Sequence, residues 1–101
     1  MEIKVLKRGE DYIELEVKGE GHTFFNALCQ KLQEDPNVVF TSYNIPHPLE
    51  DRTIFILRVS SKPVIDVLIE AVKKLKKDAL TFRSLFESAI KDFISSDGRK
   101  D

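Results

Sequence analysis

Residues 63–94 read PVIDVLIEAVKKLKKDALTFRSLFESAIKDFI, a run with no glycine and no proline after its first residue. Its apolar residues recur in alternating steps of four and three, at positions that we call the helical seam: Leu68, Val72, Leu75, Ala79, Phe82, Phe86, Ala89 and Phe93. A mean spacing of about 3.5 residues is typical of a helix that turns one face toward a neighbouring helix. The pattern therefore predicts one continuous helix over 63–94, with residues 78–81 as the place where a break would fall.

The predicted helix is long for a chain of this size. At about 1.5 Å per residue it would span about 48 Å, whereas a compact domain of about 100 residues has a radius of gyration of about 13 Å. Leaving the large side chains of the seam in water would forgo on the order of 10 kcal/mol, which is comparable with the stability of a whole small domain. We therefore expect the seam to pack against a second chain. The alternative is that the chain's own sheet covers it, beginning with the N-terminal half around Ile65 and Ile69.

Composition indicates a single small domain without a strong charge. The 101 residues include 16 basic and 17 acidic side chains and carry a formal charge of −1, so bulk attraction to nucleic acid or to an anionic membrane is not expected. Cys29 is the only cysteine, which excludes an internal disulfide and a cysteine-rich zinc site. No apolar run approaches the length of a membrane span and the first residues do not resemble a signal peptide, so we predict a cytoplasmic protein without membrane contact.

The first part of the chain predicts two strands and a helix. Apolar and polar residues alternate over residues 1–17, with a turn centred on Gly9, as in a half-buried β-hairpin. Thr23 is expected to be the N-cap of a helix of about eleven residues. This helix should end at the Asp35–Pro36 pair, because the residue before a proline disfavours helical geometry. The apolar face of this helix consists of Phe24, Phe25, Leu28, Cys29 and Leu32.

Two more strands and the seam helix complete the predicted fold. The strands cover Val38–Ile45 and Thr53–Val59, and the second is almost wholly apolar, which favours a central position in the sheet. The order strand, strand, helix, strand, strand, helix predicts an α+β domain. It is a two-layer ββαββα arrangement with an antiparallel sheet and both helices on one face. We expect one domain over residues 1–95 and a polar, disordered tail over 96–101.

The sequence predicts no catalytic residues, no cofactor and no metal site. His22, Cys29 and His47 match no zinc-ligand spacing, and a cysteine on an apolar helical face usually packs in the core. There is no nucleophile in a strained turn beside a histidine and no glycine-rich phosphate loop. We therefore do not expect an independent enzyme.

A group of lysines lies on the predicted long helix, at Lys73, Lys74, Lys76 and Lys77. Glu70 precedes the first two by three and four residues, which is the orientation that favours ion pairs along a helix. We interpret the group as a solvated face of the helix. Contact with an acidic partner surface or with nucleic acid is the alternative, although the neutral total charge argues against a nucleic-acid binder acting alone.

Two segments carry a resemblance to a known family. His22–Leu28 reads HTFFNAL and Val39–Leu49 reads VFTSYNIPHPL. The pairing of a His-Thr-x-x-Asn helix start with a Tyr-x-Ile-Pro-His-Pro loop resembles the signature of the archaeal RNA polymerase subunit L family, the counterpart of the small alpha-like subunit of eukaryotic polymerases. The resemblance runs over most of the chain. The residues that match the two motifs are His22, Thr23, Asn26, Tyr43, Ile45, Pro46, His47 and Pro48.

This resemblance implies a small, non-catalytic subunit of DNA-directed RNA polymerase. In that family the two helices pack against the equivalent helices of the larger, D-type alpha-like subunit, and the heterodimer is the platform on which the catalytic subunits assemble. The magnesium site and the nucleotide chemistry belong to other chains, and no sequence-specific nucleic-acid contact is expected of this one. The chain departs from the family at Phe25, where many members have glycine, and at residues 60–63, which lack the common glycine-containing turn.

The partner interface is expected on the apolar faces of the two helices. Their side chains would leave water only when the partner's helices arrive, while the stiff loop from Pro46 to Pro48 would present a preformed contact to a neighbour. Replacing Phe82 or Phe86 with aspartate should then abolish partner binding and spare the sheet. The expected interface residues are Phe24, Phe25, Leu28, Leu32, Leu68, Val72, Leu75, Ala79, Phe82, Phe86 and Phe93. An apolar seam also suits a homodimer, so a homodimeric or small-ligand-binding module unrelated to transcription is the alternative.

Overall fold

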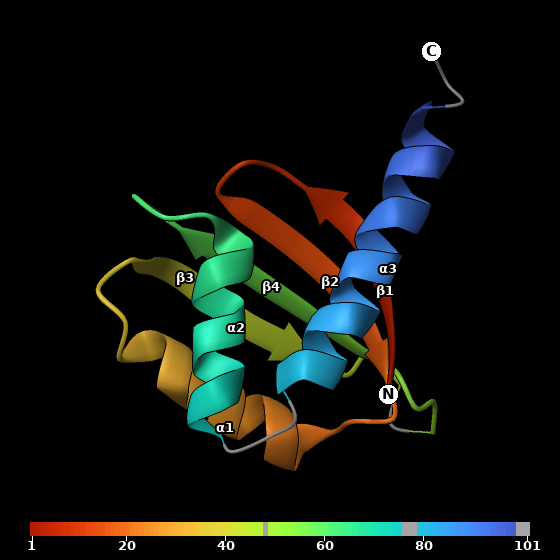
Figure 1. The fold of residues 1–101 in the computed structure, drawn as a ribbon. Coiled ribbons are helices and arrows are strands. Elements are labelled where there is room, and N and C mark those ends of the chain that lie inside the picture. The colour runs from red at the N-terminus through yellow and green to blue at the C-terminus, as the bar shows by residue number, and fades with distance from the viewer. Residues whose placement is uncertain (48, 76–78, 99–101) are drawn as a thin grey trace.

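The computed structural model describes residues 1–47, 49–75 and 79–98 of the chain. Its elements are β1 (Glu2–Arg8), β2 (Tyr12–Lys18), α1 (His22–Gln33), β3 (Val38–Asn44), β4 (Thr53–Val59), α2 (Val64–Lys74) and α3 (Ala79–Gly98). The four strands of this part form one antiparallel sheet in the order β1-β2-β4-β3. The helices cover one face of that sheet (Figure 1). The predicted α+β class with a single antiparallel sheet is confirmed.

The core lies between the sheet and the helical layer. Side chains alternate along each strand, so that one set faces the helices and the other set faces away from them. The inward residues of β2 and β4 are each at most 1% exposed: Ile13, Leu15, Val17, Thr53, Phe55, Leu57 and Val59. The apolar strand β4 is central, as its sequence predicts, because β2 and β3 pair with its two sides.

The seam is divided between two helices, so the prediction of one continuous helix is wrong. α2 ends at Lys74 and α3 begins at Ala79, and the residues between 75 and 79 lie outside the described ranges. The two helices run side by side in opposite directions (Figure 1). α2 packs over β4 and α3 packs over β1. The physical reason is that the reversal lets the chain's own sheet cover both halves of the seam.

Burial within the chain contradicts the expectation that the seam lies in water until a partner arrives. Five seam residues belong to the core, with exposed fractions from 0 to 6%: Leu68, Val72, Phe82, Phe86 and Ala89. Leu75, Ala79 and Phe93 are partly buried against the same core. The alternative that the sheet covers the seam is therefore what the structure shows. It holds for the C-terminal half as well as for the N-terminal half.

Two predicted boundaries shift by a few residues. α1 begins at His22, and its N-cap is Gly21, not Thr23, because the carbonyl of Gly21 accepts a hydrogen bond of 3.2 Å from the N–H of Phe25. At the other end, α3 continues to Gly98 and so extends into the segment predicted as a disordered tail. The last residues of that segment, 99–101, lie outside the described part of the chain. Among the helices that are described, none is long and apolar enough to cross a bilayer.

Candidate interaction surfaces

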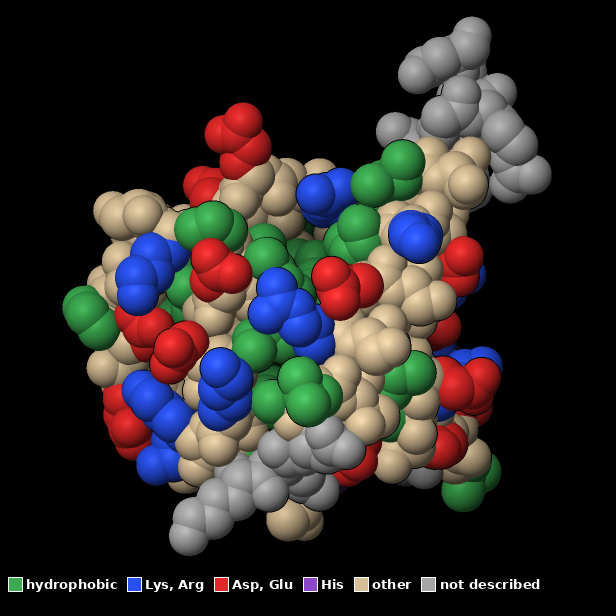
Figure 2. All heavy atoms as spheres, viewed as in Figure 1, with side chains coloured by type: hydrophobic (Ala, Val, Ile, Leu, Met, Phe, Trp, Pro, Cys, Tyr) green, Lys and Arg blue, Asp and Glu red, His purple; other side chains and the backbone are tan. Residues whose placement is uncertain are grey.

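A groove lies between α2, α3 and the turn that joins β1 to β2, and we call it the α2–α3 groove. It has a volume of about 400 Å³. Its apolar lining consists of Ile13, Pro63, Val64, Ile65, Phe86 and Ile90. Charged side chains of both signs stand around it, at Arg8, Glu10, Arg83, Glu87 and Lys91. Figure 2 shows hydrophobic side chains in the hollow between the helices and charged side chains at its border.

The helical periodicity explains why this groove forms. Along α3 the buried residues Phe82, Phe86 and Ala89 face the sheet, so Ile90, next to them on the helix surface, faces the gap toward α2. From the other side of the gap α2 contributes Ile65. Both isoleucines are only partly buried. An apolar hollow with a charged rim is the usual composition of a protein interface, so this surface is a candidate for binding a partner helix.

The ion pair on the rim of the groove has little influence on stability. Arg83 and Glu87 are 3.8 Å apart, one turn from each other on α3, and both side chains are about half exposed. Pairs of this kind contribute about 0.3–0.5 kcal/mol. Their value at an interface lies instead in orienting a partner of complementary charge.

The residues predicted for the partner interface come together in the chain's own core. Eight of them are buried there: Phe24, Phe25, Leu28, Leu32, Leu68, Val72, Phe82 and Phe86. In this conformation those side chains have almost no surface to offer to a second chain. Their assignment to a partner interface stays a prediction. The members of the set that retain side-chain surface are Leu75, Ala79 and Phe93, which are partly buried.

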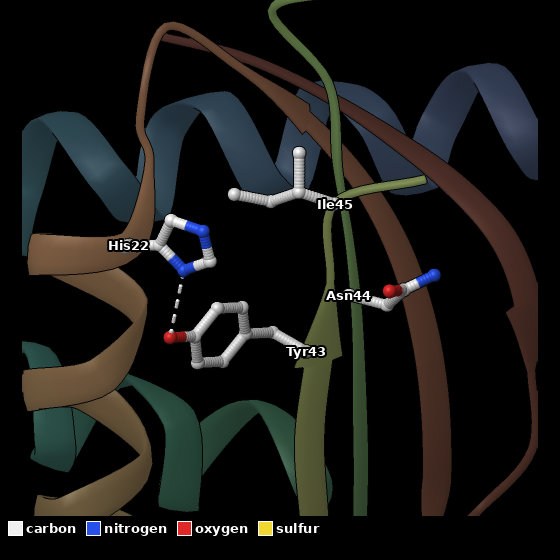
Figure 3. Close-up of a pocket in the computed structure, with 4 residues that line it drawn as sticks. All are labelled: His22, Tyr43, Asn44 and Ile45. Atoms are coloured by element: carbon white, nitrogen blue, oxygen red, sulfur yellow. Dashed lines mark hydrogen bonds between the residues drawn. The ribbon is translucent and has the colours of Figure 1, made fainter. Parts of the chain in front are cut away.

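A second hollow lies where the two motif segments meet, at the start of α1 and the end of β3. It has a volume of about 540 Å³ and is lined by His22, Tyr43, Asn44 and Ile45. His22 and Tyr43 point toward each other across it, whereas Asn44 points away (Figure 3). The Nδ1 of His22 and the hydroxyl of Tyr43 share a hydrogen bond of 3.1 Å. We call this hollow the His22–Tyr43 pocket.

Phe25 packs against Tyr43, one of the residues that line this pocket. Its ring lies 5.8 Å from the ring of Tyr43 and 5.7 Å from that of Phe55, and Phe24 meets it edge-on at 5.1 Å. Aromatic pairs at such separations add about 0.5–1.5 kcal/mol beyond the burial of their surface. The phenylalanine at the position where many relatives of the resembled family have glycine therefore fills space inside the core and adds no outward apolar surface.

The other motif residues do not line this pocket. Thr23 and Asn26 lie on the solvent side of α1, His47 is exposed and Pro46 is partly buried, while Pro48 lies outside the described residues. The backbone carbonyl of His47 accepts a hydrogen bond of 3.0 Å from the N–H of Glu50. The structure therefore brings His22, Tyr43 and Ile45 together, and among the other described motif residues Thr23, Asn26 and His47 are exposed.

Several charged or titratable groups have clear structural partners. Arg52 bridges Glu16 on β2, at 3.1 Å, and Glu50 in the loop, at 3.6 Å, so it ties this loop to the sheet. Burial raises the pKa of the Cys29 thiol, and the hydroxyl of Thr41, 3.6 Å from its sulfur, offsets this in part. A buried thiol with a raised pKa is a poor nucleophile, which agrees with the prediction that Cys29 packs in the core.

One group of residues that the sequence did not reveal lies on the sheet face that no helix covers. Arg58 of β4 is paired with Tyr12 of β2 on one side and with Phe40 of β3 on the other. Its guanidinium carbon lies 5.0 Å from the centre of the Tyr12 ring, while Phe40 is 53% exposed. The alternation along each strand contains this information, but it becomes visible only when the register between the strands is known.

No metal centre is found among the described residues, in which no three His, Cys, Asp or Glu side chains gather as ligands. Of the lysine group predicted as a solvated face, Lys73 and Lys74 are exposed at the end of α2. Lys76 and Lys77 lie outside the described ranges. The exposed pair agrees with the interpretation as a solvated face.

Comparison with known proteins gives a consistent result. The family model of the RNA polymerase Rpb3/Rpb11 dimerisation domain matches residues 12–85. DNA-directed RNA polymerase subunit Rpo11 of Archaeoglobus fulgidus is 40% identical over 75 residues, which cover 74% of this chain and 87% of that protein. The Rpo11 subunit of Nanoarchaeum equitans is 39% identical over 88 residues, covering 86% and 92%. The crystal structure of DNA-directed RNA polymerase subunit L from Thermoplasma acidophilum has the same fold, with a TM-score of 0.65, 24% identity and 92% of each chain covered.

Proposed function

Because the chain belongs to the Rpb3/Rpb11 dimerisation-domain family of RNA polymerase subunits, we propose that it is a non-catalytic assembly subunit that pairs with the larger, D-type alpha-like subunit, called the alpha-like partner below. The pair would form the platform on which the catalytic subunits assemble in the cytoplasm. Its contribution is binding alone, and the nucleotide chemistry belongs to other chains. The observation that carries this proposal is the α2–α3 groove, an apolar hollow in a domain whose family is described by dimerisation.

The shape and lining of the groove suit a helix of the partner. It lies between two helices that run side by side, and an amphipathic helix can place apolar side chains three and four residues apart into such a hollow. Ile65 and Ile90 stand on its two sides. Completing the burial of two half-buried isoleucines contributes about 1 kcal/mol each. The mixed charges on the rim favour one orientation of the partner helix over others.

The location of the groove leaves the core of the chain intact during pairing. The core residues of α2 and α3 stay packed on the sheet, while the partner covers the outer surface of the helical layer. The chain then needs no unfolding step before it pairs. This differs from a mechanism in which the seam residues leave the chain's own core and pack against the partner.

A matched pair of variants tests this assignment. The alpha-like partner from the same organism is titrated against the wild-type chain, the Ile90→Asp variant and the Leu80→Asp variant. Leu80 is on the same helix, is 81% exposed and does not line the groove. A carboxylate in the apolar groove costs about 3 kcal/mol or more at the interface, so Ile90→Asp should weaken pairing by about 100-fold. Leu80→Asp should leave it within about threefold.

Equal affinities for the three chains would show that the groove is not the interface. A chain that ignores the alpha-like partner and forms a tight homodimer would favour the alternative of a module unrelated to transcription. Circular dichroism of the free variants controls for folding, because both substituted side chains lie at least partly in solvent.

A further inference from the structure

The two edge strands of the sheet differ in charge. The edge strand β1 reads EIKVLKR and carries charges at Glu2, Lys4, Lys7 and Arg8. The opposite edge strand, β3, reads VVFTSYN and carries none. Each strand has one register irregularity, so a bulge does not distinguish them. Charged residues on an edge strand prevent pairing with other chains, and β3 lacks this protection.

The backbone of β3 presents unpaired groups along its outer side. Val59 of β4 donates its N–H to Asp11, next to β2, at 2.8 Å, so Arg58, Ile56 and Ile54 direct their backbone groups toward β3. In an antiparallel ladder alternate residues point in opposite directions. The residues between the partners of those three on β3 are Thr41 and Tyr43, and their N–H and C=O groups point outward. Outside the sheet ladders, no backbone hydrogen bond to either residue is found in the described part of the chain.

Exposed apolar side chains accompany these backbone groups. Val39 is 62% exposed and Phe40 is 53% exposed, both near the start of β3. Thr41 and Tyr43 are themselves half-buried, and α1 packs against β3. An uncharged edge strand with exposed aromatic and β-branched residues at its start is still a liability for a free protein. In a protein that works in an assembly, the same features provide a surface on which a partner strand can pair.

The His22–Tyr43 pocket lies at the other end of the same strand. Tyr43 contributes its side chain to the pocket and its outward backbone groups to the edge. The Nε2 of His22 is directed away from the hydrogen bond with Tyr43 (Figure 3). Strand addition obtains affinity from backbone hydrogen bonds and specificity from pockets that receive alternate side chains. The edge and the pocket together supply both parts.

We propose that the free edge of β3 is a docking site for an extended, uncharged strand of another polypeptide, one of whose polar side chains enters the His22–Tyr43 pocket. Only an extended backbone can satisfy the outward N–H and C=O groups of Thr41 and Tyr43 in series. The strand is uncharged because β3 offers no charge to pair with. The α2–α3 groove lies over β1 and β2, at the opposite side of the sheet, so both surfaces can be occupied at the same time.

The test is hydrogen–deuterium exchange on the chain in three states: alone, paired with the alpha-like partner, and within the purified whole polymerase. The amides of Thr41 and Tyr43 should exchange fast in the free chain and in the heterodimer, and at least about tenfold more slowly in the whole polymerase, where the strand pairs. The amides of Phe40, Ser42 and Asn44 face β4 and should be slow in all three states. Fast exchange at Thr41 and Tyr43 throughout would overturn the proposal. Slow exchange in a free chain that has the mass of a dimer would show a second copy at the edge, and would overturn it as well.

A charged residue introduced on β3 tests whether slow exchange at Thr41 and Tyr43 comes from pairing with a strand or from burial under another part of the complex. In the Val39→Lys variant, lysine stands where β3 has an exposed apolar residue, and Leu80→Lys carries the same change on α3. Val39→Lys should pair with the alpha-like partner as the wild type does. It should then either fail to enter the polymerase or enter it with fast exchange at Thr41 and Tyr43. Retained protection in Val39→Lys would contradict the proposal. Failure to form the heterodimer itself would instead concern the proposed function.

Discussion

Two neighbouring apolar residues on α3, Phe86 and Ile90, differ in how far the chain's own core covers them. Both line the α2–α3 groove, but Phe86 belongs to the core and is 1% exposed, whereas Ile90, one turn along, is only partly buried. Both lie in residues 63–94, the stretch that the sequence predicts to be helical. The difference shows that the regular seam forms the chain's own core, so the pairing that we propose uses the less regular residues beside it.

The largest effect is expected from truncation of the core residue. Phe86→Ala removes a large, fully buried side chain and should lower the free energy of unfolding of the isolated chain by about 3–5 kcal/mol. Urea denaturation of the free chain, followed by circular dichroism, measures this directly. From the sequence, Phe82→Asp or Phe86→Asp was expected to abolish pairing and spare the sheet. Because both side chains lie in the core, we now expect these variants to lose the fold. If Phe86→Ala lowered the free energy of unfolding by less than about 1 kcal/mol, Phe86 would be better assigned to the partner interface than to the core.

A smaller effect is expected at the partly buried residue. Ile90→Ala should cost the free chain about 1 kcal/mol or less, because the side chain is only partly buried there. The same change should weaken pairing with the alpha-like partner by about tenfold. Comparing unfolding of the free chain with titration of the pair separates the two values. If Ile90→Ala destabilised the free chain as much as Phe86→Ala, the contrast between the two residues would disappear.

The smallest effect concerns a surface turn outside α3. The backbone N–H of Asn37 donates to Asp35 at 2.8 Å and its side-chain amide donates at 3.0 Å, and these bonds lower the pKa of Asp35. A lowered pKa stabilises the fold above the ordinary carboxyl range, and the benefit is lost as the pH falls through the folded-state value. Asp35→Asn should therefore be slightly less stable than wild type near neutral pH. The difference should shrink in acid, as the pH falls below the ordinary carboxyl pKa of 3.8. A difference that grows in acid would contradict this assignment.

The strands and the fold class follow from local patterns in the sequence. Alternation over residues 1–17 and the apolar run of β4 each indicate a strand and its buried face, since the pleat has a period of two. The helical seam was equally clear, but periodicity defines only one face of a helix and does not say what covers it. A break at residues 78–81 was an open alternative, close to where α2 ends and α3 begins. The reversal of direction between the two helices depends on tertiary packing over β1 and β4, which the local sequence does not contain.

The candidate surfaces were partly predictable. The motif resemblance singled out His22 and Tyr43, and the structure places them in one pocket. The α2–α3 groove was not predicted, because it exists only after α3 folds back beside α2. The uncharged edge of β3 could be recognised only once the strand order was known. In a central strand the same uncharged sequence, VVFTSYN, would be paired on both sides and would leave no edge open.

The measurement that bears most directly on the proposed function is the solution mass of the chain, alone and mixed with the alpha-like partner, by light scattering after size exclusion. A folded free chain that shifts completely to a one-to-one complex is the predicted result, with Ile90→Asp failing to shift and Leu80→Asp shifting as the wild type does. A tight homodimer whose mass is unchanged by the alpha-like partner would contradict the account of this chain as an assembly subunit.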